Sequence, residues 1–316
     1  MPDDPTEETS EKDKLADQNL TAFDEPSEQS EELVNTSLID GAEAFDSNAL
    51  NRFLLEKSGR TIAIIGEFQS GKTTLSTSIY GFLKDGPFGV LEFAGSRTLI
   101  GLEKRLHDST IESGRSIPDT ERTSIQSGLQ YLHLELVDSS SGKRRDIFFS
   151  DRAGETFTQL RAGEISPNDI EEIKHASFLL ILLDGEKVAS TRHRTNALEN
   201  VRQLLRILVE DNSLSPSTII HVTTTKLDTI LEKDNSENIL THLTSFENEL
   251  NEQFGNSLFI LKFVRLAART SSNSNIGKEN LSQLASMWVS FEPELAERKK
   301  PNLVMANEFE RLMVRS

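Results

Sequence analysis

Residues 61–74 read Thr-Ile-Ala-Ile-Ile-Gly-Glu-Phe-Gln-Ser-Gly-Lys-Thr-Thr, an apolar run that leads directly into Gly66-x4-Gly71-Lys72-Thr73. The β-branched run predicts a buried strand. Glycines let the backbone that follows wrap around an anion and point its N–H groups at it. Apolar residues then recur at helical spacing, at Leu75, Ile79, Phe82 and Leu83. A strand, a glycine loop and a helix in this order predict a site for the phosphate groups of a nucleotide.

The side chains at the end of this loop have separate expected roles. Lys72 would place a positive charge on the β- and γ-phosphates, and the Thr73 hydroxyl would complete a Mg²⁺ coordination shell. The helix that begins near Thr73 adds the positive end of its dipole. The loop residues that we expect around the phosphates are Gly66, Gln69, Ser70, Gly71, Lys72, Thr73 and Thr74.

The composition excludes several classes of protein. The 316-residue chain contains no cysteine, so it has neither disulfides nor thiolate metal sites. No apolar run is as long as a membrane span, and the N-terminus is acidic rather than a basic and apolar signal segment. These features predict a cytoplasmic protein without a membrane span.

The negative charge is concentrated at the N-terminus. Residues 1–46 contain fifteen Asp and Glu but two Lys, so they carry −13 of the net charge of −17. With few large apolar residues, residues 1–48 are expected to form a disordered arm, either a solvated tail or an arm that binds a partner or masks the protein itself. The remainder is mildly acidic and has no basic stripe, so nucleic-acid binding is not expected.

The folded part is predicted to be α/β, with a mostly parallel sheet that has helices on both faces and one antiparallel hairpin strand. This domain would occupy residues 49–291, and residues 292–316 would form a charged tail with a possible amphipathic helix. Residues 86–127 are mixed in composition. Residues 129–137 and 146–150 are expected to form the hairpin, and the other expected strands are 61–66, 178–183, 218–222 and 258–266. The expected helices are 49–57, 98–107, 190–210, 235–254 and 278–290.

Polar residues follow the ends of three of these strands. In open α/β sheets the ligand lies beyond the carboxyl ends of the strands. Asp151 follows the second hairpin strand and would hold Mg²⁺, while the Gly154 N–H would meet a γ-phosphate. The two later strands are followed by Thr225-Lys226-Leu227-Asp228 and by Ala267-Ala268-Arg269.

Over residues 60–290 the chain resembles the Ras-like, translation-factor-related P-loop GTPases, through GEFQSGKT, DRAG, TKLD and the AAR stretch. The resemblance implies that GTP or GDP binds with Mg²⁺, with Thr225 opening the base-binding motif. Lys226 would stack on the base, Asp228 would accept hydrogen bonds from guanine N1 and N2, and the Ala268 N–H would approach guanine O6. Adenine lacks the donor pair that Asp228 requires.

A narrower resemblance involves residues 86–99 and 151–155, which look like the bacterial double-GTPase proteins associated with multi-gene conflict (antiviral) systems. Our leading hypothesis is a guanine-nucleotide switch that acts on an effector protein. The effector would contact residues 86–127, residues 151–166 or the acidic arm.

The sequence departs from the Ras-like pattern at the catalytic positions. The threonine that would bind Mg²⁺ in the first switch is assigned to Thr123, with Thr120 and Thr98 as alternatives. Glu155 replaces a water-orienting glutamine, and Phe68 occupies a loop position that is usually small. We therefore expect slow hydrolysis with Lys72, Glu155 and Arg152 as the candidate catalytic residues.

Other readings remain open at this point. Arg97, Arg115 and Arg122 are further candidates for a transition-state cation. The chain could also bind nucleotide without turnover, as a scaffold, or act as a P-loop ATPase or kinase. The six histidines lack ligand spacing and are interpreted as structural.

Overall fold

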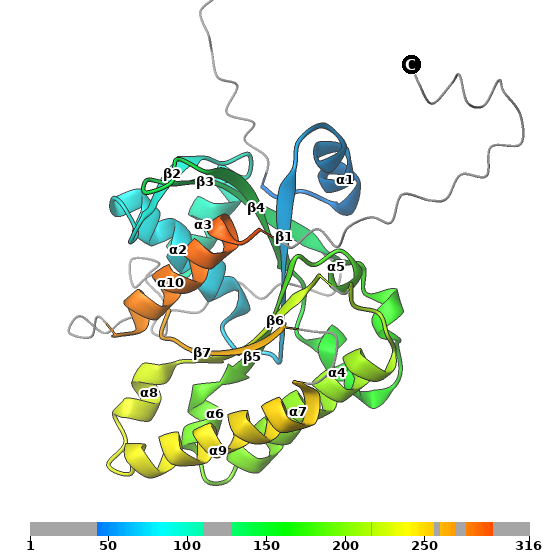
Figure 1. Ribbon diagram of the computed structural model, residues 1–316, viewed down its shortest axis with the longest axis vertical. Helices are drawn as coiled ribbons and strands as arrows, with labels where there is room; N and C mark the ends of the chain where they lie inside the picture. The colour runs from blue at the N-terminus through cyan, green and yellow to red at the C-terminus, as the bar shows by residue number, and fades with distance from the viewer. Residues whose placement is uncertain (1–42, 110–127, 216, 256–259, 269–275, 293–316) are drawn as a thin grey trace, which may run out of the picture. The chain divides into compact units, whose positions relative to one another are not determined.

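The structure is a computed structural model that describes residues 43–109, 128–215, 217–255, 260–268 and 276–292. The chain divides into two units, residues 1–38 and 39–316, and every described residue lies in the second. There, a seven-stranded sheet has the strand order β2-β3-β4-β1-β5-β6-β7 (Figure 1). In the described part of the chain, no helix is long and apolar enough to cross a membrane.

The centre of the sheet consists of parallel strands. β1 (Gly59–Gly66) pairs with β4 (Arg144–Asp151) on one side and with β5 (Phe178–Asp184) on the other. β6 (Ile219–Thr225) and β7 (Ile260–Arg265) continue the parallel pairing. Helices cover both faces of β5 and β6, which explains why β5 reads as a continuous apolar run and why every residue of β6 is buried. The strands predicted at 61–66, 178–183 and 218–222 are confirmed, and the one at 258–266 is confirmed within its described residues.

The predicted hairpin is confirmed as β3 (Gln130–Asp138) and β4. Its turn closes when the Asp138 carboxylate accepts a hydrogen bond from the Ser140 N–H at 2.9 Å. β2 (Leu91–Gly95) pairs with the other side of β3, also antiparallel. Among the strands of the described residues, β3 therefore runs against the direction of the rest. β2 was not predicted from the sequence, because Leu91 is its one fully buried residue.

Alternate residues of β1 face two separate cores, since successive side chains of a strand point to opposite faces. Ile62 and Ile64 pack under α2 (Lys72–Asp85), α3 (Leu99–Ser109) and α10 (Ile276–Ser290). Trp288 of α10 is fully buried in this core, as predicted. On the other face, Ala63 and Ile65 pack under α4 (Glu155–Ala162), α5 (Glu171–Lys174), α6 (Gly185–Ala189), α7 (Arg194–Glu210) and α9 (Ser236–Phe254).

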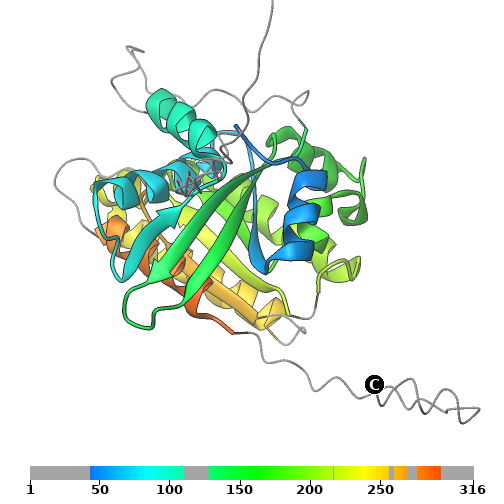
Figure 2. The ribbon, with the colours of Figure 1, turned by 90° about the horizontal axis from the view of Figure 1, so that it is seen from above.

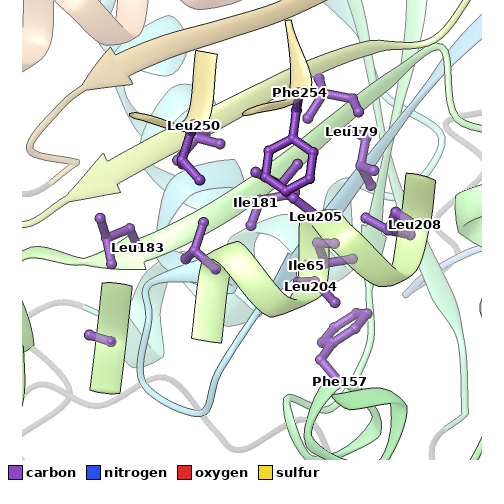
Figure 3. Close-up of a cluster of buried hydrophobic side chains, with 14 of the residues drawn as sticks. Ile65, Phe157, Leu179, Ile181, Leu183, Leu204, Leu205, Leu208, Leu250 and Phe254 are labelled. Carbon is purple, nitrogen blue, oxygen red and sulfur yellow. The ribbon is translucent and has the colours of Figure 1, made fainter. Parts of the chain in front are cut away.

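The second core shows why α7 and α9 form where they do. Figure 3 shows Leu179, Ile181 and Leu183 of β5 meeting apolar side chains of both helices. These residues recur at helical spacing, so each helix presents one apolar stripe to the sheet. The labelled helical residues are Leu204, Leu205 and Leu208 of α7 and Leu250 and Phe254 of α9.

α1 (Ser47–Glu56) covers the hairpin. It begins at Asp46, whose carboxylate accepts a hydrogen bond from the Ala49 N–H at 2.7 Å. Its Leu50 and Phe53 pack on β3 and β4, and Figure 2 shows α1 and α3 on opposite sides of these two strands. The helices predicted at 49–57, 98–107, 190–210, 235–254 and 278–290 are thus confirmed.

Among the described residues, four short α-helices were not predicted, and all but α5 begin beside the carboxyl end of a strand. α4 follows β4, α6 follows β5, and α8 (Leu227–Leu231) follows β6. Their first turns lie at the sheet edge where the sequence places the candidate site. The helix expected within residues 292–316 and most of the acidic arm lie outside the described residues.

Candidate functional site

The loop between β1 and α2 has the backbone of an anion site. Gln69 and Gly71 adopt left-handed conformations, with φ of 62° and 95°. Gly71 begins α2, and no side chain caps this helix end. The first-turn N–H groups of a helix have no partner within the helix, so they suit a bound anion. The Ser70 hydroxyl in the same loop is buried, and no described residue hydrogen-bonds to it.

Gly154 lies directly against this loop. A Cβ atom added to Gly154 would stand 2.7 Å from the Phe68 nitrogen and 2.9 Å from Lys72 Nζ. Such distances leave no room for a side chain, so glycine allows the segment after β4 to touch the loop. The predicted partners Gly154 and Lys72 are thus brought together.

Lys72 is folded back into the loop. Its Nζ donates hydrogen bonds to the carbonyls of Gly66 and Glu67, both at 3.0 Å. Burial lowers the pKa of Lys72 to about 8, although Asp151, Glu155 and Glu67 act in the opposite direction. A phosphate would supply the compensating negative charge that the buried ammonium lacks.

Thr73 and Asp151 form the predicted metal end of the site. The Thr73 hydroxyl donates to Asp151 Oδ1 at 3.4 Å, and the Asp151 side chain is almost fully buried. In the described residues there is no cluster of three or more His, Cys, Asp or Glu side chains that could enclose a metal. One hydroxyl and one carboxylate fit Mg²⁺, which keeps several ligand positions for substrate phosphates and water.

The assignment of the first-switch threonine stays a prediction. Thr123 and Thr120 lie outside the described residues, as do Arg115 and Arg122. The alternative Thr98 is fully buried, and its hydroxyl accepts the His133 N–H at 2.8 Å.

Arg152 and Glu155 occupy different surroundings. The Arg152 guanidinium donates to both carboxylate oxygens of the buried Glu172, at 2.5 and 3.0 Å. Glu155 is the first residue of α4, and its charge acts on Lys72. Arg97 lies over the Phe53 ring, 5.1 Å from its centroid. In this conformation Arg152 is thus committed to a structural ion pair.

The base end of the predicted site lies at the ends of β5 and β6. Lys226 has a left-handed φ of 50° and donates to Asp184 at 3.1 Å and to Glu186 at 2.9 Å. Burial lowers the pKa of Lys226, but these two carboxylates outweigh burial and raise it. Asp228 lies in the first turn of α8.

Two contacts tie the base end to the rest of the edge. The Thr225 hydroxyl donates to the Ser70 carbonyl at 2.9 Å, which joins the end of β6 to the phosphate loop. The Leu227 N–H donates to the Leu266 carbonyl at 3.1 Å, so the segment with Ala268 lies beside α8. The sequence-predicted loop and base residues that are described therefore share one edge of the sheet.

Two charged groups at this edge were missed in the sequence. Glu67 accepts hydrogen bonds from Arg161, Lys187 and Asn200 at 2.9, 2.7 and 2.6 Å, which fix the loop to α4, α6 and α7. Arg105 of α3 donates to Asp151 at 3.1 Å. No local pattern signals either contact, because the partners lie far apart in the chain.

Several solved structures have a similar arrangement of strands and helices. The elongation factor SelB from Methanococcus maripaludis, in complex with the GTP analogue GppNHp, is 16% identical with a TM-score of 0.39 over 73% of this chain. The chain spans 33% of the length of SelB. The signal recognition particle receptor SRb-GTP/SRX complex from Chaetomium thermophilum is 14% identical with a TM-score of 0.39, over 73% of this chain and 99% of the other.

A further structure is a GTP-binding protein from Sulfolobus solfataricus in complex with GDP. It is 16% identical with a TM-score of 0.36, over 76% of this chain and 57% of the other. No curated protein matches the chain. The sequence model of the family "Double-GTPase 2" matches residues 60–289, which include the loop, Asp151, Gly154, Asp228 and Ala268. The chain therefore belongs to the Double-GTPase 2 family.

Proposed function

We propose that this protein is a cytoplasmic guanine-nucleotide switch that binds GTP and GDP with Mg²⁺ and hydrolyses GTP slowly. One observation carries the proposal. The phosphate loop and the Thr225–Asp228 segment lie at the same sheet edge, joined by the hydrogen bond from the Thr225 hydroxyl to the Ser70 carbonyl. A nucleotide would lie along this edge, with phosphates at the loop and base at α8.

At the phosphate end, the chain supplies positive charge and N–H groups. The Lys72 ammonium would turn from the carbonyls of Gly66 and Glu67 to the β- and γ-phosphates. Thr73 and Asp151 would hold the metal, directly or through water, and Gly154 would donate its N–H to the γ-phosphate. Mg²⁺, when bound, neutralises charge on the phosphate oxygens.

At the base end, the chain supplies selectivity. Asp228 would accept two hydrogen bonds from guanine, while the Lys226 side chain would lie over the ring, still held by Asp184 and Glu186. A carboxylate that loses its donors on burial is costly, so adenine would be rejected.

The expected rate is low because of the residues beside the γ-phosphate. Glu155 is an anion where a neutral water-orienting group would be more effective, and Arg152 is held by Glu172. Glu155 would therefore position the attacking water only weakly. Arg152 would take part in catalysis only if its ion pair with Glu172 opens.

Isothermal titration calorimetry tests the proposal. The full chain with Mg²⁺ should bind GDP and GTP, and ATP should bind at least about a hundredfold more weakly, as expected when a base cannot satisfy the site's polar groups. Equal or tighter binding of ATP would contradict it and favour a P-loop ATPase or kinase.

A second candidate is a nucleotide-binding scaffold without turnover. Glu155 and the pairing of Arg152 with Glu172 favour it. Phosphate release from GTP in a single turnover separates the two candidates. The switch requires release above that of Lys72→Ala, and a rate equal to that of this variant would establish the scaffold.

The proposal also covers the surface that binds the effector protein and the biological system in which the protein acts. We assign the effector surface to residues 86–127 and 151–166, or to the acidic arm, and the setting to a bacterial defence system. Phage plating on bacteria with and without the protein tests the setting. The intact chain should reduce plaque numbers and Lys72→Ala should not.

A further inference from the structure

Arg105 connects α3 with the proposed metal end of the site. Its Nε donates to Asp151 Oδ2 at 3.1 Å, and its Nη2 donates to Gln130 Oε1 at 2.8 Å. Its Nη1 donates to the Gly101 carbonyl one helical turn earlier, at 3.3 Å. The Arg105 side chain is 17% exposed and that of Asp151 is 4% exposed, so the ion pair is largely shielded from water.

This ion pair uses the carboxylate that the proposed metal requires. Asp151 Oδ1 accepts from Thr73, the other proposed ligand, and Oδ2 accepts from Arg105. A guanidinium and a divalent cation at one shielded carboxylate repel each other, because little solvent screens them. Arg105 and the metal therefore compete for Asp151.

Arg105 also lies beneath the segment that leads in from the acidic arm. A Cβ atom on Gly101 would stand 1.6 Å from the Glu43 carbonyl oxygen, so this backbone lies directly on α3. Lys104 forms a salt bridge with Glu43 at 3.9 Å. Phe45 exchanges two backbone hydrogen bonds of 2.9 Å with Tyr131, the neighbour of Gln130.

We propose that Arg105 is a built-in counter-cation that Mg²⁺ displaces from Asp151, and that this displacement loosens the hold of α3 on residues 43–46. The inference rests on the proposed nucleotide site. Residues 43–46, which follow the acidic arm, would then be coupled to the metal end of the site. The coupling would run through Asp151, Arg105, the first turns of α3 and Glu43.

The first test measures how much Mg²⁺ is needed for half-maximal binding of a fluorescent GDP by the full chain. Arg105→Gln should lower this concentration about tenfold, within the usual range of coupling between two ligands. Lys84→Gln is the matched control, because it removes one positive charge that pairs with Glu103 of α3 away from Asp151 and Glu43, and it should leave the value unchanged. An unchanged or raised requirement in Arg105→Gln would overturn the inference.

Arg105→Lys tests whether charge or shape matters. It keeps a cation beside Asp151, so its Mg²⁺ requirement should return to within about threefold of the unaltered protein, since Lys retains charge without the planar fork. A requirement as low as in Arg105→Gln would contradict the role of charge. A wild-type chain that shows no saturable GDP binding at any Mg²⁺ concentration would instead refute the nucleotide site itself.

The second test follows α3 itself. The chain contains no cysteine, so Ile100→Cys places one label on an exposed position of α3, where Ile100 is 51% exposed. An environment-sensitive dye there should change its emission as Mg²⁺ and GDP bind, and the change should persist with Lys84→Gln. It should be lost with Arg105→Gln, in which no guanidinium remains to be displaced. Emission that responds equally in all three proteins would overturn the link to α3.

Discussion

Lys72 is the residue at which burial and charge conflict most clearly. Its ammonium is held by two carbonyls of its own loop, and burial lowers its pKa to about 8. A nucleotide phosphate would replace the carbonyls with full negative charge and raise this pKa again. An anion in the loop would therefore offset the cost of burying this cation.

This conflict predicts that nucleotide affinity depends on pH. Above about pH 8 the unliganded protein loses the Lys72 proton, while the bound form keeps it, so binding takes up a proton. The dissociation constant for GDP should therefore rise above pH 8, by up to about tenfold per pH unit. Titrations between about pH 7 and 9.5 measure it, a window that spans this pKa.

Lys72→Arg is the control, because arginine keeps its proton throughout this range. The guanine ring titrates in the same region, and its contribution cancels when the two proteins are compared. Identical pH profiles would contradict the assignment of Lys72 to the phosphates.

At the scale of the elements, the contact between the end of β4 and the phosphate loop leaves no room for a Cβ atom at Gly154. Gly154 approaches backbone atoms of Glu67 and Phe68, and these cannot move aside as a flexible side chain would. Gly154→Ala should therefore displace the loop and weaken GDP binding at least about tenfold, with a loss of about 1–3 kcal/mol in unfolding free energy from overpacking.

Thermal unfolding and GDP titration measure both effects. Gly95→Ala is the matched control, since an added Cβ there would meet its nearest atom, Glu135 Oε2, at an ordinary 3.6 Å. If Gly154→Ala binds and melts as Gly95→Ala does, the loop is not held by this close approach.

The elements differ in how well the sequence predicts them. Buried parallel strands leave apolar runs, and α7 and α9 leave stripes at helical spacing, so both are readable locally. β2 buries Leu91 and leaves Glu92 and Phe93 exposed, which resembles a loop. α6 and α8 are five residues each, too short for a periodic pattern.

The residues of the site also differ in whether a local sequence pattern predicts them. The loop and strand-end motifs are contiguous in sequence, so their residues could be predicted before the fold was known. The pairs Arg105–Asp151 and Arg152–Glu172 join residues 46 and 20 positions apart. The sequence carries no signal for them, and the second pair holds the Arg152 guanidinium against Glu172.

At the scale of the whole molecule, His221 makes folding sensitive to acid. It lies fully buried in β6, between β5 and the edge strand β7, and no described residue hydrogen-bonds to either ring nitrogen. Burial lowers the pKa of His221 to about 4, and the charge of Lys262 acts in the same direction. The unfolded chain takes up a proton below its ordinary pKa of about 6.5, whereas the folded chain does not.

His221 therefore contributes stability above pH 6.5 that is lost as the pH falls from about 6.5 to 4, a loss of about 3 kcal/mol. His221→Leu should melt at the same temperature or higher at pH 7, because it removes unpaired polar atoms. It should also lose less stability between pH 7 and 5 than the unaltered protein. Parallel pH curves from urea unfolding would show that His221 is not the acid-sensitive group.

The central claim concerns the whole sheet edge, where one end would hold the phosphates and the other would recognise the base. The most direct test is the base preference of Asp228→Asn, measured by calorimetry with Mg²⁺ and with GDP, xanthosine diphosphate and ADP. An amide donates where the carboxylate accepts, so the variant should lose GDP affinity and prefer the xanthine nucleotide by at least about tenfold. Retained preference for GDP in Asp228→Asn would contradict the account.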